Sequence, residues 1–322
     1  MKILFTSVGR RVELMQAFHM AADEMGIELS IVGTDVTDTA PALFFCDETK
    51  IVCRISDEKY IPQLLAICQK DQIDCLIPTI DTDLLLLAKN KGKFEEIGTK
   101  VLVSDVEKVK LCRDKRFTAD YFQSIGLKSP LPVDSIEKYN SGYPAFIKPK
   151  DGSSSVDAYK VGNIQDLEIY AEKVKDYIIQ PYIDGKEYTI DIFCDYSGNP
   201  VYITPRERLA VRAGEVLKTR ICQDEKMIEE MKLLISDYKP CGQITVQLIQ
   251  DKTTGENYYI EINPRFGGGA PLSIKAGANS AKAVIKMLSG EKLEYKEKAA
   301  KDGAIYSRFD QSICINEAIE DA

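Results

Sequence analysis

Short apolar runs and longer amphipathic stretches alternate along the first hundred residues of the chain. Apolar runs between turn residues predict strands, and apolar positions spaced three or four residues apart predict helices. The expected strands are Lys2–Val8, Leu29–Thr34, Cys75–Pro78 and Lys100–Ser104. The expected helices are Arg11–Gly26, Asp57–Gln69 and Thr82–Asn90. This alternation is typical of a parallel sheet with helices on both faces, so we expect an α/β domain in residues 1–105.

The pattern changes after residue 105. Residues 106–125 predict one or two helices, and Pro144–Pro149 predicts a buried strand that contains Lys148. The stretch that follows is rich in small residues whose N–H and hydroxyl groups could close over phosphates. The residues concerned are Gly152, Ser153 and Ser154. A plain hairpin turn is the alternative interpretation.

A strand interrupted by a proline is predicted at residues 177–183. A proline cannot donate to a sheet, so we expect it to free the backbone groups around it for the hydrogen-bonding edge of a flat heterocycle. The residues concerned are Gln180, Pro181, Tyr182 and Ile183. Glu187, after the following turn, could accept hydrogen bonds from two ribose hydroxyls. An edge strand with a hairpin is the alternative.

Two strands joined by a polar loop are predicted at Gln243–Gln250 and Tyr258–Asn263. A hairpin that folds symmetrically about Thr254 would place position 247 opposite position 261, since each is seven residues from the centre. The sequence therefore predicts that Gln247 and Glu261 meet across the hairpin.

Polar and apolar residues alternate in the second of these strands. Glu261 and Asn263 should share one face, while Ile260 and Ile262 point into an apolar layer. Together with Gln247, they supply one carboxylate and two amide oxygens, a hard ligand set of low charge that suits Mg²⁺. An ordinary amphipathic hairpin is the alternative.

Arg265 follows on the same face and could fork onto a phosphate or a carboxylate. Glycines come next, among them Gly268 and Gly269, and they would let a substrate carboxylate approach backbone N–H groups closely. This run predicts an anion-binding site directly after the candidate metal ligands.

Residues 204–220 carry four arginines and a lysine in a chain of net charge −8. Arg206 and Arg208 would share a face if this segment is extended. We expect an anion site here, with Arg206 as a candidate catalytic residue and Arg208, Arg212 and Lys218 as candidate substrate residues. A solvated charged loop is the alternative.

In open parallel sheets, ligands bind beyond the carboxyl ends of the strands. One such end, Ser7–Arg11, places a glycine and two arginines at a helix start, where an anion is favoured, so Arg10 is a candidate substrate residue. The sequence does not match Gly-x-Gly-x-x-Gly, which gives a nicotinamide site little support. A solvated helix start is the alternative.

Composition agrees with a metabolic enzyme. A length of 322 residues with 44% hydrophobic residues supports two or three packed domains, and the net charge of −8 argues against nucleic acid or an anionic membrane as the partner. Nine scattered cysteines, with no Cys-x-x-Cys pair, predict reduced thiols. A single histidine, His19, argues against His-rich metal sites and a Ser-His-Asp triad. With no apolar run of membrane-spanning length and no signal peptide, we expect a cytoplasmic protein.

These motifs resemble the ATP-grasp superfamily, and in particular the ATP-binding domain of the carbamoyl phosphate synthetase large chain and single-domain carboxylate-amine ligases. The resemblance covers roughly residues 1–290. Its elements occur in the family's order: Lys115, Ile147-Lys148-Pro149, the Gly-Ser stretch, Gln180-Pro181-Tyr182-Ile183, Gly185-x-Glu187, Gln247 and Glu261-Ile262-Asn263-Pro264-Arg265.

The resemblance implies a Rossmann-like pre-ATP-grasp domain at residues 1–105. It also implies a two-lobed ATP-grasp domain with antiparallel sheets, whose small lobe is residues 106–184 and whose large lobe, with the metal site and tail, is residues 185–322. Lys115 and Lys148 would contact the α- and β-phosphates, residues 180–183 would hold adenine and Glu187 the ribose. The three metal ligands would bind two Mg²⁺ ions, for which Mn²⁺ is a possible substitute, and Arg265 would steady the γ-phosphate.

The mechanism implied is phosphoryl transfer from ATP to a carboxylate, which gives an acyl phosphate that an amine attacks. The alternatives are an enzyme acting on bicarbonate, as in carbamoyl phosphate synthesis, and a non-catalytic ATP-binding module. The sequence shows one copy of the ATP-binding unit, so we do not expect a complete carbamoyl phosphate synthetase. A homodimer is a family-level expectation, and the tail at residues 291–322, with a possible strand at 303–309, could cover a sheet edge or contact a partner.

Overall fold

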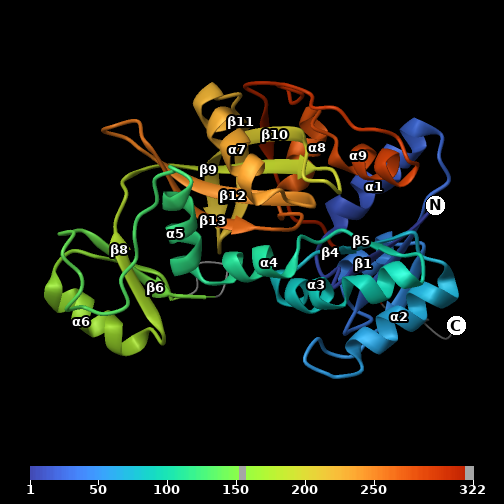
Figure 1. Cartoon of the computed structure of the whole chain (residues 1–322), viewed down its shortest axis with the longest axis horizontal. Coiled ribbons are helices and arrows are strands. Elements are labelled where there is room, and N and C mark those ends of the chain that lie inside the picture. The colour runs from blue at the N-terminus through green and yellow to red at the C-terminus, as the bar shows by residue number, and fades with distance from the viewer. Residues whose placement is uncertain (152–156, 316–322) are drawn as a thin grey trace, which may run out of the picture. The chain divides into compact units, whose positions relative to one another are not determined.

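The computed structural model describes residues 1–151 and 157–315, so the predicted phosphate-loop residues Gly152, Ser153 and Ser154 lie outside the described residues. The chain divides into two compact units (Figure 1). One comprises residues 1–101 with the tail from Ser307, and the other comprises Leu102–Tyr306.

The first unit is built on a five-stranded parallel sheet with the strand order β3-β2-β1-β4-β5. Its strands are β1 (Lys2–Thr6), β2 (Ser30–Asp35), β3 (Glu48–Ile51), β4 (Cys75–Pro78) and β5 (Lys100–Val101). Its helices are α1 (Val12–Met25), α2 (Tyr60–Asp71), α3 (Asp81–Glu96) and the 3-10 helix η1 (Pro41–Phe45). The predicted alternation of parallel strands and helices is confirmed. The sequence did not predict β3, because this edge strand alternates half-buried and exposed residues and has no apolar run.

The second unit begins with two short helices, α4 (Val106–Arg113) and α5 (Lys115–Ser124). Asp114 separates them, and its side chain accepts a hydrogen bond from the Arg116 N–H at the start of α5. Such a cap satisfies one of the N–H groups that have no partner within the helix. Lys115 is therefore fixed as the first residue of a capped helix.

A three-stranded antiparallel sheet follows, with the order β7-β6-β8. Its strands are β6 (Ala145–Pro149), β7 (Tyr159–Val161) and β8 (Tyr177–Pro181), and α6 (Ile164–Lys173) adds Leu167 to its core. The expectation that Pro181 frees the surrounding backbone is wrong for Tyr182, whose N–H donates to the Pro144 carbonyl at 3.2 Å. Pairing resumes at once because a proline removes only its own N–H.

The largest sheet has six strands in the order β13-β12-β9-β10-β11-β14. The strands are β9 (Gly185–Cys194), β10 (Pro200–Arg212), β11 (Glu215–Ile221), β12 (Gly242–Asp251), β13 (Asn257–Asn263) and β14 (Ile305–Ser307). The helices are α7 (Glu225–Tyr238), α8 (Ala270–Ala276) and α9 (Ser280–Leu288). The basic segment 204–220 thus forms most of the β10–β11 hairpin, and the solvated-loop alternative is wrong. β14 comes from the tail and lies beside β11.

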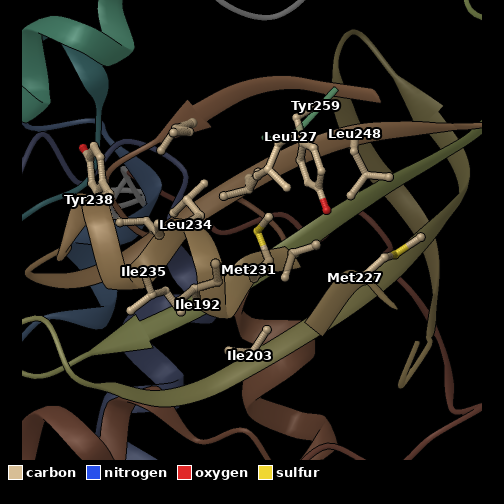
Figure 2. Packing of buried hydrophobic residues seen from close by; sticks show 14 of the residues in the cluster. Leu127, Ile192, Ile203, Met227, Met231, Leu234, Ile235, Tyr238, Leu248 and Tyr259 are labelled. Carbon is tan, nitrogen blue, oxygen red and sulfur yellow. The ribbon is translucent and has the colours of Figure 1, made fainter. Parts of the chain in front are cut away.

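One face of the six-stranded sheet is apolar and is covered by α7. Figure 2 shows Met227, Met231 and Leu234 of this helix packed over the strands that carry Ile192 and Ile203. All five side chains are 2% exposed or less. Because the apolar side chains of these strands fill a packed core on this face, the polar side chains that alternate with them along each strand project from the opposite face.

The nine cysteines are free thiols, as predicted.

Two neighbouring leucines of α7 test this packing. Leu234 is fully buried, whereas Leu233 is 46% exposed. We expect Leu234→Ala to lower the free energy of unfolding by about 2–5 kcal/mol, because it removes buried methyl groups and leaves a cavity. The matched variant Leu233→Ala should cost about 0.5 kcal/mol or less. Urea unfolding followed by circular dichroism measures both, and equal losses would contradict the packing described.

Candidate active site

Backbone pairing of β12 with β13 places Gln247 directly opposite Glu261, and Thr245 opposite Asn263. The register predicted from the symmetry of the hairpin is confirmed. Opposite residues on paired strands project to the same face, as do residues two apart on one strand. The Asn263 Nδ2 donates to the Glu261 Oε1 at 2.9 Å. Three oxygen-bearing side chains, those of Gln247, Glu261 and Asn263, therefore share one face.

The pairing shifts by one residue beyond Gln247, which leaves Ile260 as the extra residue of a β-bulge. A bulge turns two successive residues toward one side of the sheet. Ile260 and Glu261 accordingly line the same cavity, while Tyr259 and Ile262 lie in the apolar core. The prediction that Ile260 points into the apolar layer is wrong, because the bulge interrupts the alternation.

A cavity of about 500 Å³ is lined by residues from both sheets of the second unit. The predicted site residues that line it are Lys115, Lys148, Gln180, Pro181, Tyr182, Ile183, Glu187, Arg208, Gln247 and Glu261. Asn263 adjoins it through the hydrogen bond to Glu261. The sequence did not point to the apolar part of the lining, which is formed by Phe146, Tyr188, Val211, Leu248, Ile249 and Ile260.

Two lysines bring positive charge to this cavity. Lys148 is 7% exposed, and burial lowers its pKa to about 8, with repulsion from Lys115 acting the same way and Glu261 opposing both. Burial also lowers the pKa of Lys115, against the attraction of Glu261 and Asp151. Buried cations of this kind are stabilised by an anion between them. The cavity is thus suited to a phosphate chain.

Arg208 and Glu187 form an ion pair at the cavity wall, with 3.3 Å between the Arg208 Nε and the Glu187 Oε2. The Arg208 Nη2 also donates to the Gly214 carbonyl at 2.9 Å. Burial lowers the pKa of Arg208, and Glu187 opposes this shift. Arg208 therefore ties the turn of the β10–β11 hairpin to the strand that carries Glu187.

Asp191 of β9 is a buried carboxylate that sequence reasoning missed. It accepts hydrogen bonds from the Arg206 Nε at 2.8 Å and from the hydroxyls of Ser273 at 2.6 Å and Thr245 at 3.2 Å. The signal in the sequence was an acidic residue between two isoleucines in a strand. Unpaired charges are almost never buried, so such a residue indicates a buried partner.

The other predicted residues are not part of the described cavity lining. Arg10 belongs to the first unit, where its side chain is exposed, and Arg212 and Lys218 are exposed on the β10–β11 hairpin. Arg265 is half-buried, and its Nη1 donates to the Phe266 carbonyl at 3.2 Å.

The two predicted glycines precede α8. Gly268 is half-buried and Gly269 is buried, and Gly269 lies against the guanidinium group of Arg206. A Cβ at position 269 would lie 2.7 Å from the Arg206 Nη2.

Within residues 1–151 and 157–315, no three His, Cys, Asp or Glu side chains gather as a metal site. In the same residues no helix is long and apolar enough to span a membrane. A cation at this site would therefore need the amide oxygens of Gln247 and Asn263 beside the Glu261 carboxylate. That set fits Mg²⁺ bound together with phosphate oxygens and water.

Two family models match the chain. Residues 3–102 match the PylC-like N-terminal domain, and residues 173–310 match the model described as ATP-grasp in the biosynthetic pathway with Ter operon. The carbamoyl-phosphate synthase of Methanobrevibacter smithii is 27% identical, over 92% of this chain and 84% of the relative. D-alanine–D-alanine ligase B of Clostridium perfringens is 31% identical, over 43% of this chain and 52% of the ligase.

Among solved structures, the biotin carboxylase domain of Hydrogenobacter thermophilus 2-oxoglutarate carboxylase aligns with a TM-score of 0.75 at 18% identity. The alignment covers 94% of this chain and 73% of that domain, which was solved as a dimer with MgADP and bicarbonate. At this identity the likeness shows the fold. These comparisons confirm the resemblance to the ATP-grasp superfamily and to carbamoyl phosphate synthetase, and the chain is an enzyme.

Proposed function

We propose that the chain is an ATP-dependent carboxylate-amine or carboxylate-thiol ligase. It would transfer the γ-phosphoryl group of ATP to a small carboxylic acid or amino acid. The acyl phosphate would then be attacked by an amine or thiol, with release of ADP and phosphate.

One observation carries this proposal. Gln247 and Glu261 are opposite each other in the hairpin, and they line the same cavity as the buried Lys148. A binding protein for an uncharged ligand has no need for oxygen ligands and a buried ammonium group in one cavity. A nucleotide bound with Mg²⁺ would need both, because the cation and the lysines would together neutralise the negative charge of its phosphate groups.

In this proposal Gln247, Glu261 and Asn263 would hold two Mg²⁺ ions. The Asn263 amide presents its nitrogen to Glu261, so its oxygen lies on the other side of the amide group. Bound metal would neutralise charge on the transferring phosphoryl group.

The chain's own residues would orient the remaining groups. Lys115 and Lys148 would hold the α- and β-phosphates, and residues 180–183 would contact the adenine. Glu187, which the Arg208 ion pair already orients, would hold the ribose. Arg265 would stabilise charge that develops on the γ-phosphate, since such chemistry depends mainly on positioning and charge neutralisation.

A second candidate is an enzyme that phosphorylates bicarbonate. The match to a carbamoyl-phosphate synthase over 92% of the chain favours it. Release of ADP that depends on bicarbonate and needs no amine would distinguish it from a carboxylate-amine ligase. Binding of ATP without turnover on any acid would favour a non-catalytic module.

The dimer of the biotin carboxylase domain supports a homodimer for this chain.

Phosphate release is the first test. Purified protein with ATP and Mg²⁺ is incubated with single amino acids or small carboxylates, and hydroxylamine traps any acyl phosphate as a hydroxamate. We expect one acid to give a hydroxamate, and chelation of Mg²⁺ by EDTA to abolish it. Glu261→Ala should give none, because it removes the only carboxylate of the proposed ligand set. Hydroxamate from the Glu261→Ala variant at the wild-type rate would contradict the metal site.

Arg265→Ala should lower kcat by about 10²- to 10³-fold, the usual effect of losing a donor aimed at developing charge. Arg113→Ala, which removes an exposed arginine at the end of α4, is the control and should leave kcat unchanged. Steady-state phosphate release measures both variants. An Arg265→Ala enzyme with wild-type turnover would exclude the proposed role.

Nucleotide affinity should fall as the pH rises above about 8, where buried Lys148 loses its proton in the unliganded protein. Only the ammonium form attracts phosphate, so Kd for MgADP should rise by up to about tenfold per pH unit above this pKa. Calorimetric titration between pH 7 and 9.5 measures this. Lys148→Met should bind more weakly, with a smaller pH dependence. An identical pH dependence in this variant would show that another group is responsible.

A further inference from the structure

Arg208 brings a positive charge to the cavity from the six-stranded sheet. Among the described residues, the other cations of the lining are Lys115 of α5 and Lys148 of β6. The pairing of β10 with β9 ends at Glu207, and the register with β11 shifts directly after Arg208. Such an irregularity bends a strand and re-aims its side chains at the rim of a sheet. The position of Arg208 at the cavity wall therefore follows from the end of one ladder and the bulge in the next.

The guanidinium group of Arg208 is held loosely for a buried cation. Its side chain is 7% exposed, and its Nε lies 3.3 Å from the Glu187 Oε2 without making a hydrogen bond to any described residue. The Nη1 donates to the Thr189 hydroxyl at 3.4 Å, whereas the Nη2 bond to the Gly214 carbonyl is shorter, at 2.9 Å. A buried donor without a partner is costly. Because this group lines a cavity, an acceptor on a bound ligand can complete its hydrogen bonds.

Two carboxylates attract Arg208. Glu187 is 55% exposed and lines the same cavity, so a ligand can reach it. The charge of Glu261 acts on Arg208 as well, and it also acts on Lys115 and Lys148. In the proposed function, Glu187 holds the ribose and Glu261 holds metal beside the phosphates. The phosphate chain of such a nucleotide runs from the first carboxylate towards the second, and we expect it to pass the guanidinium group that both attract.

We propose that Arg208 exchanges partners when a nucleotide binds. Its guanidinium group leaves Glu187 for a phosphate of the nucleotide, and the ribose hydroxyls take its place on Glu187. Phosphate is an acceptor that arginine binds with two parallel charge-assisted hydrogen bonds. A ligand with only a ribose, or only phosphates, would satisfy one member of the pair and leave the other without its partner.

The ion pair would therefore favour nucleotides over nucleosides and over inorganic phosphates. This exchange rests on the proposed function, because it assumes that the cavity holds ATP, and it adds a coupling between the two ends of that ligand.

Three ligands separate the two halves of the exchange. Adenosine carries the ribose alone, magnesium pyrophosphate carries the phosphates alone, and MgADP carries both. The variants are Arg208→Gln and Glu187→Gln, each of which removes one charge of the pair. Arg113→Gln is the matched control, since this arginine is exposed at the end of α4. Circular dichroism establishes that each variant is folded, and displacement calorimetry gives Kd for each ligand.

The two variants should change affinity in opposite directions. In Arg208→Gln, we expect Kd for MgADP and for magnesium pyrophosphate to rise by about tenfold or more, because a charge-assisted hydrogen bond to phosphate is lost. Kd for adenosine should fall, because no cation then competes for Glu187. Glu187→Gln should weaken adenosine binding and tighten pyrophosphate binding, and Arg113→Gln should leave all three values unchanged. Arg208→Lys, which keeps the charge without the planar fork, should show the same signs as Arg208→Gln with smaller changes.

Weaker adenosine binding by Arg208→Gln and Arg208→Lys, with pyrophosphate binding unchanged, would overturn the exchange, because Arg208 would then only orient Glu187. Unchanged affinity for all three ligands in both variants would overturn it as well. Either result, with MgADP bound by the wild type, leaves the proposed function intact. Failure of the wild type to bind MgADP would remove the proposed function and the exchange together.

Discussion

The site depends on the backbone pairing of β12 with β13. Main-chain hydrogen bonds place Gln247 against Glu261, and no side-chain interaction has to bring these residues together. A slip of one residue would turn every side chain of the strand to the opposite face, which would move Glu261 into the apolar core and Ile262 out of it. Burial of Tyr259 and Ile262 therefore fixes the position of the proposed metal ligands.

The two faces of the six-stranded sheet have different roles, one in the stability of the fold and the other in the proposed chemistry. Its apolar face packs against α7, and its other face carries a row of polar side chains that includes Arg206, Thr189 and Gln247. Asp191 supports this polar face from within, because its carboxylate joins β9 to β10, to β12 and to the α8 helix. A charged group held in this way loses little freedom when a ligand binds, which is the physical basis of preorganisation.

Much of this arrangement could be predicted from the sequence. Alternation of apolar and polar residues predicted the parallel sheet and the strands of the β12–β13 hairpin, and the symmetry of the hairpin gave the correct register for Gln247 and Glu261. Such features are local, and the pattern of residues encodes them directly.

Other features could not be predicted because they depend on contacts between distant segments. The bulge at Ile260 follows from the pairing of two strands, and nothing in the strand itself marks it. The Arg206–Asp191 pair joins residues 15 apart, so Arg206 was predicted as a candidate while its partner was missed. The short strand β3 is stabilised by its neighbour β2 and has no apolar run of its own.

The most direct test of the central claim is a crystal structure of the protein with ADP and Mn²⁺, in which anomalous scattering locates the metal. The account predicts metal coordinated by the Glu261 carboxylate, with the oxygens of Gln247 and Asn263 in the same cluster and phosphate oxygens completing the coordination. A nucleotide bound in the cavity with its metal away from Glu261, and with the Asn263–Glu261 hydrogen bond intact, would contradict it.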